Sequence, residues 1–390
     1  MVESHKREVG PLKILMISEL FPFCNAEGEL NVQGGGENHM YAISRELSDN
    51  NEITVLTSLI PESTYPDDRF PFEIVNVYNK KITSNASDGF RFVIRLSKKI
   101  KRLNEKFDVI IPQTFTPIYS TSLARIKKTV VPIIHDVYQP IPLVSGISAW
   151  KDLQTNNLIK GLQGSLLERA CLYYASKCLA VITVSDSSFE ILQYWIPRHK
   201  IRVTGNGIYR EDFRSAKKDI DVICIARLDV PYKNVNHVCE AVLDTNLKTI
   251  IVGEGKLKQK FEAKYGRKNV EFVGSVSQTE KQELLSRSRV LVSASSLEGF
   301  GVTLLEGLAS GCLVAASDIK PHRFVDQNSN ILRFFTVGDI IGLRKLLNEL
   351  LSLSESEVRN AEKKGYTLLE QYWTWKVVAG KTEAVLNSVL

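Results

Sequence analysis

The sequence predicts an α/β protein with two doubly wound, Rossmann-like domains that face each other across a deep interdomain cleft. Short runs rich in Val and Ile alternate with longer helical patterns, an order typical of parallel sheets with crossover helices. A chain of 390 residues normally divides into two domains. The alternation pauses once, over the polar stretch 205–218, which has two glycines and no hydrophobic periodicity.

The strands predicted before this pause are short apolar runs without alternation, as expected for strands buried on both faces of a parallel sheet. Their ranges are 13–18, 52–57, 108–112, 129–134, 179–184 and 201–204. The helical patterns between them occupy 37–49, 92–105, 157–176 and 187–194.

The same alternation restarts after the pause and predicts a second domain. Its strands are expected at 219–226, 248–252, 270–273, 289–293, 313–316 and 331–335. Its helices are expected at 234–244, 279–288, 302–310 and 338–351.

We place the first domain at 1–205, a hinge at 206–218 and the second domain at 219–354. The remaining 355–390 is a helical segment that could pack back onto the N-terminal domain, and it carries two tryptophans, Trp373 and Trp375, that could anchor it to a domain. In open parallel sheets, ligands bind beyond the carboxyl ends of the strands. The junctions between strands and helices are therefore the places where chemistry is expected.

The composition, 44% hydrophobic and 24% charged, is that of a soluble globular protein. No apolar run reaches the roughly 18 to 20 residues that a membrane span needs, and the polar start, 1–10, does not resemble a secretory signal. The six cysteines are scattered without a CxxC pair, which favours buried thiols over a metal or disulfide role. A reducing cytoplasm is the expected location.

One stretch of the chain is densely basic although the net charge of +6 is modest. Its cations are Arg91, Arg95, Lys98, Lys99, Lys101 and Arg102. Apolar residues recur among them at helical spacing. A solvated helix face is the commoner origin of such a pattern. Peripheral docking on the anionic inner face of a membrane is the alternative.

The strongest local signal is the run SLEGFGVTLLE, residues 296–306, which follows the predicted strand 289–293 and opens a helix. Glycine lets the backbone approach a ligand closely, and the free N–H groups of a helix start favour a phosphate. The residues expected to bind the donor here are Gly299, Phe300, Gly301 and Val302.

Two carboxylates flank these glycines. Glu306, about one turn into the helix, could accept two hydrogen bonds from a vicinal diol such as ribose, and Glu298 could do the same for a sugar. The alternative is a capped helix with acidic residues near its positive end, which is itself stabilising.

The first half of the chain offers two weaker signals. The glycines Gly35 and Gly36 lie between a strand and a helix and could hold a phosphate or the acceptor, although a tight turn explains them equally well. His135 follows the predicted strand 129–134, so it should stand at the mouth of the cleft. Asp136 could orient His135 or bind the acceptor.

Taken together, these motifs resemble family 4 of the retaining glycosyltransferases, which have the GT-B fold. The pattern E-x7-E of Glu298 and Glu306 carries most of the resemblance. Further matching elements lie in the family's order along nearly the whole chain: 34–37, His135-Asp136, Ser185, 206–208, 226–228 with Lys233, 252–255, 270–274 and 309–315. Tyr209, Ser295, Ala226 and Leu313 depart from the family pattern. These departures put the subfamily in doubt more than the activity.

The resemblance implies a hexosyltransferase that takes its sugar from a nucleotide-sugar, with UDP or GDP as the nucleotide. The acceptor is expected to be a glycan or a lipid-linked glycan, bound mainly by the N-terminal domain. Catalytic roles fall to His135, which should contact the donor sugar, and to Glu298, which should orient it. No cofactor and no nucleic-acid partner are expected.

Arg227 and Lys233 follow the first predicted strand of the second domain and could reach a diphosphate. A nucleoside diphosphate gains negative charge as it leaves, and fixed cations can stabilise that charge in place of a metal ion. The Asp219-Ile220-Asp221 triplet precedes an apolar strand and is interpreted as the polar start of that strand. We therefore expect transfer without a metal.

Alternative functions use the same architecture. A phosphorylase or hydrolase would need a pyridoxal-phosphate lysine, of which there is no sign, or hydrolysis of the donor without an acceptor. A scaffold without catalysis would be expected to lose the acidic and basic site residues, which this chain retains. A Rossmann dehydrogenase would carry G-x-G-x-x-G after its first strand, and this fingerprint is missing.

Overall fold

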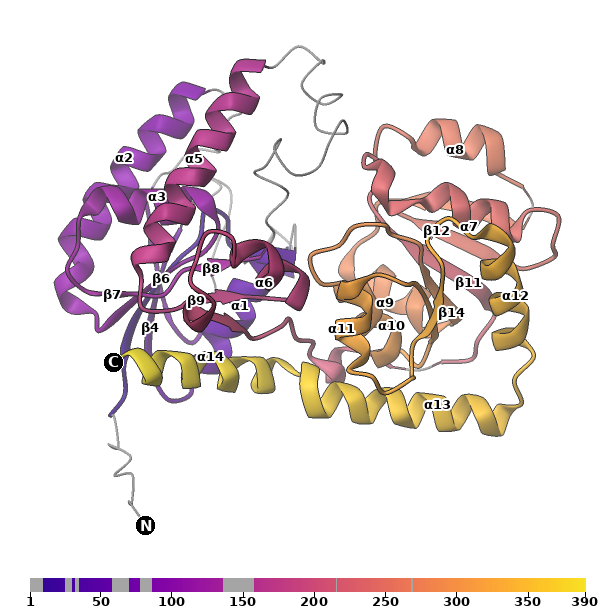
Figure 1. Cartoon of the computed structure of the whole chain (residues 1–390). Helices are drawn as coiled ribbons and strands as arrows, with labels where there is room; N and C mark the ends of the chain where they lie inside the picture. The colour runs from indigo at the N-terminus through magenta and orange to yellow at the C-terminus, as the bar shows by residue number, and fades with distance from the viewer. Residues whose placement is uncertain are drawn as a thin grey trace. The chain divides into compact units, whose positions relative to one another are not determined.

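A computed structural model of the chain describes residues 10–24, 30–31, 35–57, 70–77, 86–135, 158–214, 216–267 and 269–390 (Figure 1). Contacts divide the chain into two compact units. The first is Met1–Thr204 together with Val378–Leu390, and the second is Gly205–Val377.

The first unit is built on a parallel sheet with the strand order β5-β4-β1-β6-β7. Its strands are β1 (Lys13–Ile17), β4 (Glu52–Thr57), β5 (Glu73–Asn76), β6 (Val109–Pro112) and β7 (Thr129–Val130). A second parallel sheet has the order β10-β9-β8, with β8 (Ile133–Ile134), β9 (Val181–Thr183) and β10 (Ile201–Val203). A small antiparallel pair, β2 (Phe23–Cys24) and β3 (Leu30–Asn31), lies outside these sheets.

The single strand predicted over 129–134 is two strands, so this prediction was wrong. Pro132 has no N–H and interrupts the ladder between β7 and β8. The backbone changes partner at this point: the N–H of Val131 still donates to Ile110 O, whereas Pro132 O accepts from the N–H of Ile182. A bridge between Gln113 and Ile133 continues the pairing of β6 onto β8.

Helices connect the strands of the first unit. They are α1 (Gly35–Leu47), α2 (Ala86–Leu103), α3 (Phe115–Ala124), α5 (Leu158–Lys177) and α6 (Asp186–Leu192). The sequence did not predict α3 or β5. The apolar stripe of α2 is buried: Phe92, Leu96 and Ile100 are at most 1% exposed and belong to one core cluster with Leu15 and Ile110.

The second unit has one six-stranded parallel sheet with the order β13-β12-β11-β14-β15-β16. Its strands are β11 (Ile220–Ile225), β12 (Thr249–Val252), β13 (Val270–Gly274), β14 (Ser288–Ser293), β15 (Leu313–Ser317) and β16 (Arg333–Phe335). Each predicted strand of this half is present, with ends that differ by up to two residues. The order reverses next to β11, so β11 and β14 bracket the crevice where ligands bind in such sheets.

The helices of the second unit are α7 (Val235–Val242), α8 (Lys258–Tyr265), α9 (Gln278–Ser286), α10 (Val302–Ala309), α11 (Lys320–Asp326), α12 (Ile340–Leu351) and α13 (Glu355–Leu368). Of these, α8 and α11 were not predicted. The buried face of the sheet, with Val222, Val290 and Ala315, packs with Val238 of α7 and Leu347 of α12 in one core cluster.

The predicted tail 355–390 is helical in two parts with a turn of π-helix, Leu369–Trp373, between α13 and α14 (Trp375–Val389). Trp373 is buried within the second unit, where its Nε1 donates to Val325 O at 2.8 Å. Its ring meets Phe300 edge to face at 5.1 Å. Gly205, with φ +91, lets the chain pass this ring, because a Cβ there would lie 2.4 Å from it. Residues 378–390 belong to the first unit.

No helix within the described ranges is long and apolar enough to cross a membrane. The five cysteines whose side chains the structure describes are free and buried.

Candidate functional site

In the second unit, the predicted donor residues follow the carboxyl ends of β11 and β14. The turn after β12 lies directly on the segment after β11. Gly253 and Gly255 have φ angles of +141 and +151, and a Cβ on them would lie 1.9 Å from Ala226 O and 2.2 Å from Asp229 N. Only glycine permits this approach. Hydrogen bonds from Leu228 N to Glu254 O (2.8 Å) and from Leu257 N to Leu228 O (2.9 Å) complete the contact.

Lys233 and Glu298 form an ion pair at this edge of the sheet. Lys233 Nζ lies 2.6 Å from Glu298 Oε1, and their side chains are 19% and 14% exposed. The same oxygen accepts a hydrogen bond from Ser295 Oγ at 2.7 Å. Ser295 is one of the departures from the family pattern, and here its hydroxyl helps to fix the Glu298 carboxylate.

The two loops that carry this pair are joined by further hydrogen bonds. Asn234, in the left-handed conformation with φ 50, donates from Nδ2 to Ala294 O at 3.0 Å. The N–H of Ser296 donates to Tyr232 O at 2.8 Å. Lys233 and Glu298 therefore lie on segments that hold each other in place, which is the support that a preorganised site needs.

The glycine-rich turn before α10 has the predicted geometry of a helix start. Gly301 is the N-cap residue with φ 104, and Val302 is the first residue of the helix. Phe300 is 3% exposed, with its ring against Phe324 and Trp373, so only its backbone could face a ligand. No side chain caps α10, which leaves the N–H groups of its first turn open to an anion.

Glu306 is 8% exposed and is paired with a lysine that was not among the site residues predicted from the sequence. Lys281, in the first turn and a half of α9, places Nζ 2.7 Å from Glu306 Oε1. Nothing in the local pattern of α9 marks Lys281, because its partner lies in another helix. The pair fixes one oxygen of the carboxylate and leaves the second for another donor.

His322 is a second residue that the sequence did not single out. It is fully buried in α11, with Nδ1 at 2.8 Å from Ser317 O, and a Cβ on Gly301 would lie 3.3 Å from its ring. Burial lowers the pKa of His322, while the Ser317 carbonyl and the Glu298 carboxylate act in the opposite direction. A neutral His322 thus packs against Gly301 and supports the glycine-rich turn before α10.

Arg227 differs from the other predicted donor residues in being exposed. Its side chain is 65% exposed, and its guanidinium lies 3.8 Å from the Asp229 carboxylate, which is 44% exposed. An ion pair this open is weak. The guanidinium of Arg227 is therefore available to an anionic ligand.

The first unit brings together Gly36, Gln113 and His135 at the carboxyl ends of β6 and β8. Gln113 Nε2 lies 2.6 Å from Gly36 O and 2.6 Å from His135 Nε2. His39, one turn into α1, is fully buried, and its ring meets that of His135 edge to face at 4.5 Å. Burial lowers the pKa of His135 to about 4.

The contacts of Gln113 define the tautomer of His135. A backbone carbonyl can only accept, so the atom of Gln113 that faces Gly36 O must be the amide nitrogen. The same nitrogen faces His135 Nε2. His135 Nε2 then accepts a hydrogen bond, and the proton of the neutral ring lies on Nδ1, where it can be donated.

The other predicted residues of the first unit differ in how closely they lie to Gln113 and His135. Gly36 would place a Cβ 3.2 Å from Gln113 Nε2, whereas Gly35 is exposed with open space around it. Asp136 lies outside the described residues. Glu19, after β1, was not predicted. Burial raises the pKa of Glu19, and a hydrogen bond with Thr116 partly offsets this.

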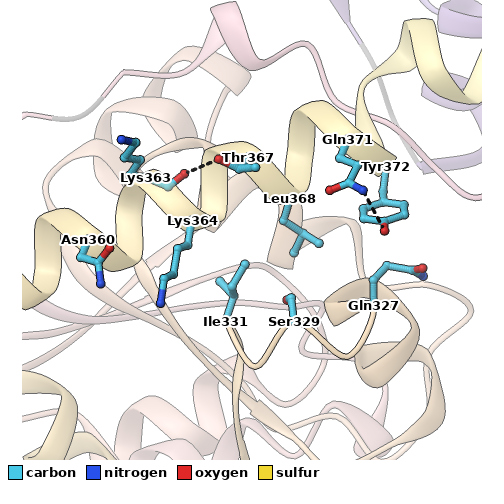
Figure 2. A pocket seen from close by; sticks show the side chains of 10 residues that line it. All are labelled: Gln327, Ser329, Ile331, Asn360, Lys363, Lys364, Thr367, Leu368, Gln371 and Tyr372. Atoms are coloured by element: carbon cyan, nitrogen blue, oxygen red, sulfur yellow. Dashed lines mark hydrogen bonds between the residues drawn. The ribbon is translucent and has the colours of Figure 1, made fainter.

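One hollow of about 430 Å³ lies in the second unit, between α13 and the segment that joins α11 to β16 (Figure 2). Its lining includes Gln327, Ile331, Lys364 and Tyr372 and none of the predicted site residues. The segment enters β16 at its amino end, whereas the predicted donor residues follow the carboxyl ends of the strands. The hollow therefore belongs to the opposite edge of the sheet from the candidate site.

Solved structures with this fold define its class. Sucrose-phosphate synthase from Thermosynechococcus elongatus is similar with a TM-score of 0.75 at 15% identity, covering 97% of this chain and 98% of that chain. Anabaena HepE, in complex with UDP and glucose, gives a TM-score of 0.72 at 15% identity, covering 97% and 100%. The fold is that of the GT-B glycosyltransferases.

Two family models narrow this class. Residues 33–212 match the model described as Glycosyltransferase Family 4, and residues 206–366 match Glycosyl transferases group 1. The chain belongs to glycosyltransferase family 4 and is a glycosyltransferase. It is also similar to the MMP alpha-(1->4)-mannosyltransferase of Mycolicibacterium hassiacum, with 24% identity over 326 residues, which are 79% of this chain and 77% of that protein.

Proposed function

We propose that this enzyme is a retaining hexosyltransferase that uses a UDP- or GDP-sugar and needs no metal ion. The observation that carries the proposal is the arrangement in the second unit, where two acidic residues are each held by a lysine beside an open helix start. Lys233 holds Glu298 at 2.6 Å, and Lys281 holds Glu306 at 2.7 Å.

The nucleotide is assigned to the start of α10 and to Glu306. The diphosphate lies against the uncapped N–H groups after Gly301, with Arg227 and Lys233 as cations that stabilise the charge of the leaving group. The free oxygen of Glu306 accepts from the ribose hydroxyls. Fixed cations of this kind supply the electrostatic stabilisation that a divalent metal supplies in other transferases.

The transferred sugar is assigned to Glu298 and His135. Glu298, fixed by Lys233 and Ser295, orients the sugar ring, and the Nδ1–H of neutral His135 donates to a sugar hydroxyl. In the transfer step, the bond from the anomeric carbon to the diphosphate oxygen breaks as the acceptor oxygen bonds on the same face. The acceptor proton passes to the departing phosphate.

The acceptor is proposed to be a glycan or a lipid-linked glycan, with Gly35, Gly36 and Asp136 contributing to its binding or to that of the distal phosphate. The similarity to a named mannosyltransferase supports a hexose as the transferred sugar. A cytoplasmic enzyme that contacts the inner face of a membrane peripherally would meet such an acceptor.

Calorimetric titration with UDP, GDP and ADP, each in magnesium and in EDTA, tests this function. One nucleotide should bind equally well in both buffers. Glu306→Ala should abolish most of this binding, while Glu298→Ala should keep it and lose turnover.

Two outcomes would contradict the assignment. Nucleotide binding that disappears in EDTA would overturn the role of Arg227 and Lys233. No binding of any nucleotide would favour the alternative of a transferase-like scaffold without catalysis, and donor hydrolysis without an acceptor would favour a hydrolase.

A further inference from the structure

The amino-terminal edge of the sheets in the first unit concentrates positive charge. Three stretches, 98–108, 123–128 and 173–179, lead directly into β6, β7 and β9. β6 and β7 belong to one parallel sheet, so the first two stretches meet at its amino-terminal edge. The third stretch leads into β9 of the second sheet and is joined to them by shared core packing. We call the three stretches the basic edge. It is opposite the edge where Gln113 and His135 follow their strands.

Packing within the unit supports this placement. Phe107, Ala124 and Cys178, one from each stretch, belong to a single core cluster with Val130 of β7, and Leu103 and Tyr174 pack against it. Figure 1 shows α2, α3 and α5 side by side, and their many mutual contacts agree with this view. The residues between these core positions are therefore presented on the surface of the same edge.

The basic edge has nine cationic side chains and two acidic ones. This excess is larger than the net charge of the whole chain, +6. The exposed cations are Lys98, Lys101, Arg102, Lys106, Arg125, Lys127 and Lys177. The two carboxylates are Glu105 and Asp108, and Asp108 accepts from the backbone N–H of Lys13 at 2.8 Å. In the part of the chain that the structure describes, none of the exposed cations has an ion pair.

Large apolar side chains are exposed among these cations. Leu123 is 44% exposed, Leu179 is 58% exposed and Tyr173 is 66% exposed. The Lys177 ammonium lies 4.9 Å above the Tyr173 ring. Lys200, before β10, donates to Ser176 O at 2.9 Å and extends the charged surface. A purely polar ligand gives no reason to leave three such side chains in water.

We infer that the basic edge docks the enzyme on an anionic lipid bilayer. Lysine and arginine side chains lie at the headgroups, while Leu123, Leu179 and Tyr173 enter the boundary between headgroups and acyl chains. Because the apolar stripe of α2 is already buried in the core, docking uses the helix ends and not an inserted helix face. The inference rests on the proposed peripheral contact, and it leaves the edge with His135 uncovered by the membrane.

Vesicle cosedimentation tests the inference without any need for turnover. Vesicles of phosphatidylcholine with about one third phosphatidylglycerol should bind the enzyme, and pure phosphatidylcholine vesicles should not. Replacing Lys101, Arg102, Lys106 and Lys127 by Ala should lower the partition coefficient about a hundredfold in low salt. A matched variant with Lys256, Lys260, Lys345 and Lys376 replaced by Ala loses the same charge from exposed sites of the second unit and should bind as the unchanged enzyme does.

The apolar residues distinguish a membrane from a soluble acidic polymer. The double variant Leu123→Ser, Leu179→Ser should lose about tenfold in vesicle binding and nothing in binding to soluble polyphosphate. Unchanged vesicle binding by this variant would assign the surface to an acidic polymer and overturn the inference. Equal losses in the two charge variants, or equal binding to neutral vesicles, would overturn it as well. Nucleotide titration of every variant reports the proposed transferase function separately.

Discussion

The amide nitrogen of Gln113 lies 2.6 Å from His135 Nε2 and 2.6 Å from the carbonyl oxygen of Gly36. One buried side chain therefore links Gly36, in the first turn of α1, to the histidine after β8. Gln113 is 1% exposed. It is a positioning residue, since it acts on the proposed sugar site through His135.

Replacing Gln113 by Leu should slow transfer more than it weakens donor binding. Without the amide, His135 Nε2 has no donor to hold it, and the ring loses the tautomer that places the proton on Nδ1. We expect kcat to fall about ten- to a hundredfold, as for other groups that orient a catalytic partner, with the Kd for the nucleotide within about twofold. Steady-state kinetics and calorimetry measure both.

The control for this variant is Gln193→Leu in the same unit. The Gln193 side-chain amide donates to Glu190 O, at the end of its own helix. A Gln113→Leu enzyme with normal kcat would contradict the positioning role. So would equal loss of kcat in both variants.

His135 should remain neutral well below the ordinary pKa of histidine. Burial lowers its pKa from 6.5 to about 4. As the pH falls, the unfolded chain therefore takes up this proton first. The free energy of unfolding is therefore not reduced by His135 above pH 6.5. It falls as the pH drops from 6.5 toward 4, by about 3 kcal/mol in total.

NMR titration of the histidine Cε1–H resonances would measure this pKa directly, with His135→Asn to assign the signal. In denaturant unfolding, the unchanged enzyme should lose more free energy of unfolding between pH 7 and pH 4 than His135→Asn does. A His135 that titrates near 6.5 would contradict the buried, neutral ring.

Lys281 should contribute to nucleotide affinity through Glu306. Lys281→Met leaves the Glu306 carboxylate without the cation at 2.7 Å, so its orientation toward a ribose diol is lost. We expect the nucleotide Kd to rise about tenfold, or about 1.4 kcal/mol. Glu306→Gln should weaken nucleotide binding by a similar amount. The double variant should bind only a little more weakly than either single variant, because both changes break the same ion pair.

A matched variant, Lys264→Met, breaks a partly exposed pair of the same unit, Lys264 with Glu240 at 3.5 Å, and should leave nucleotide binding unchanged. Fully additive losses in the Lys281 and Glu306 variants would mean that the two residues act independently.

The sequence predicts those site residues whose signal is local. Glu298, Gly301 and Glu306 lie within one short motif after a strand, so their spacing reveals them. Gln113 and Lys281 carry no such signal, because their partners are distant in the chain: Gly36 is 77 residues from Gln113, and Glu306 is 25 residues from Lys281. Only the folded sheet and helices bring them together.

The fold follows the same rule. The buried parallel strands of the second unit are short, mostly apolar runs, and their pattern predicts them well. In the first unit, α3 was missed because its sequence FTPIYSTSLA contains few good helix formers and little periodicity. The break between β7 and β8 depends on Pro132, which ends one ladder while the strand direction continues.

Gly253→Ala should damage the proposed donor site of the second unit through the backbone. With φ +141, the new Cβ would lie 1.9 Å from Ala226 O, and a backbone atom cannot rotate away as a flexible side chain can. The segment with Arg227 must shift, so we expect a loss of stability of about 2 kcal/mol or more and a rise of at least about tenfold in the nucleotide Kd. Thermal unfolding and calorimetry measure the two effects.

Gly380→Ala is the control, because a Cβ there meets nothing within 4 Å in α14 and should stabilise the helix by about 0.5–1 kcal/mol. A Gly253→Ala enzyme that binds nucleotide normally would remove the turn after β12 from the donor site.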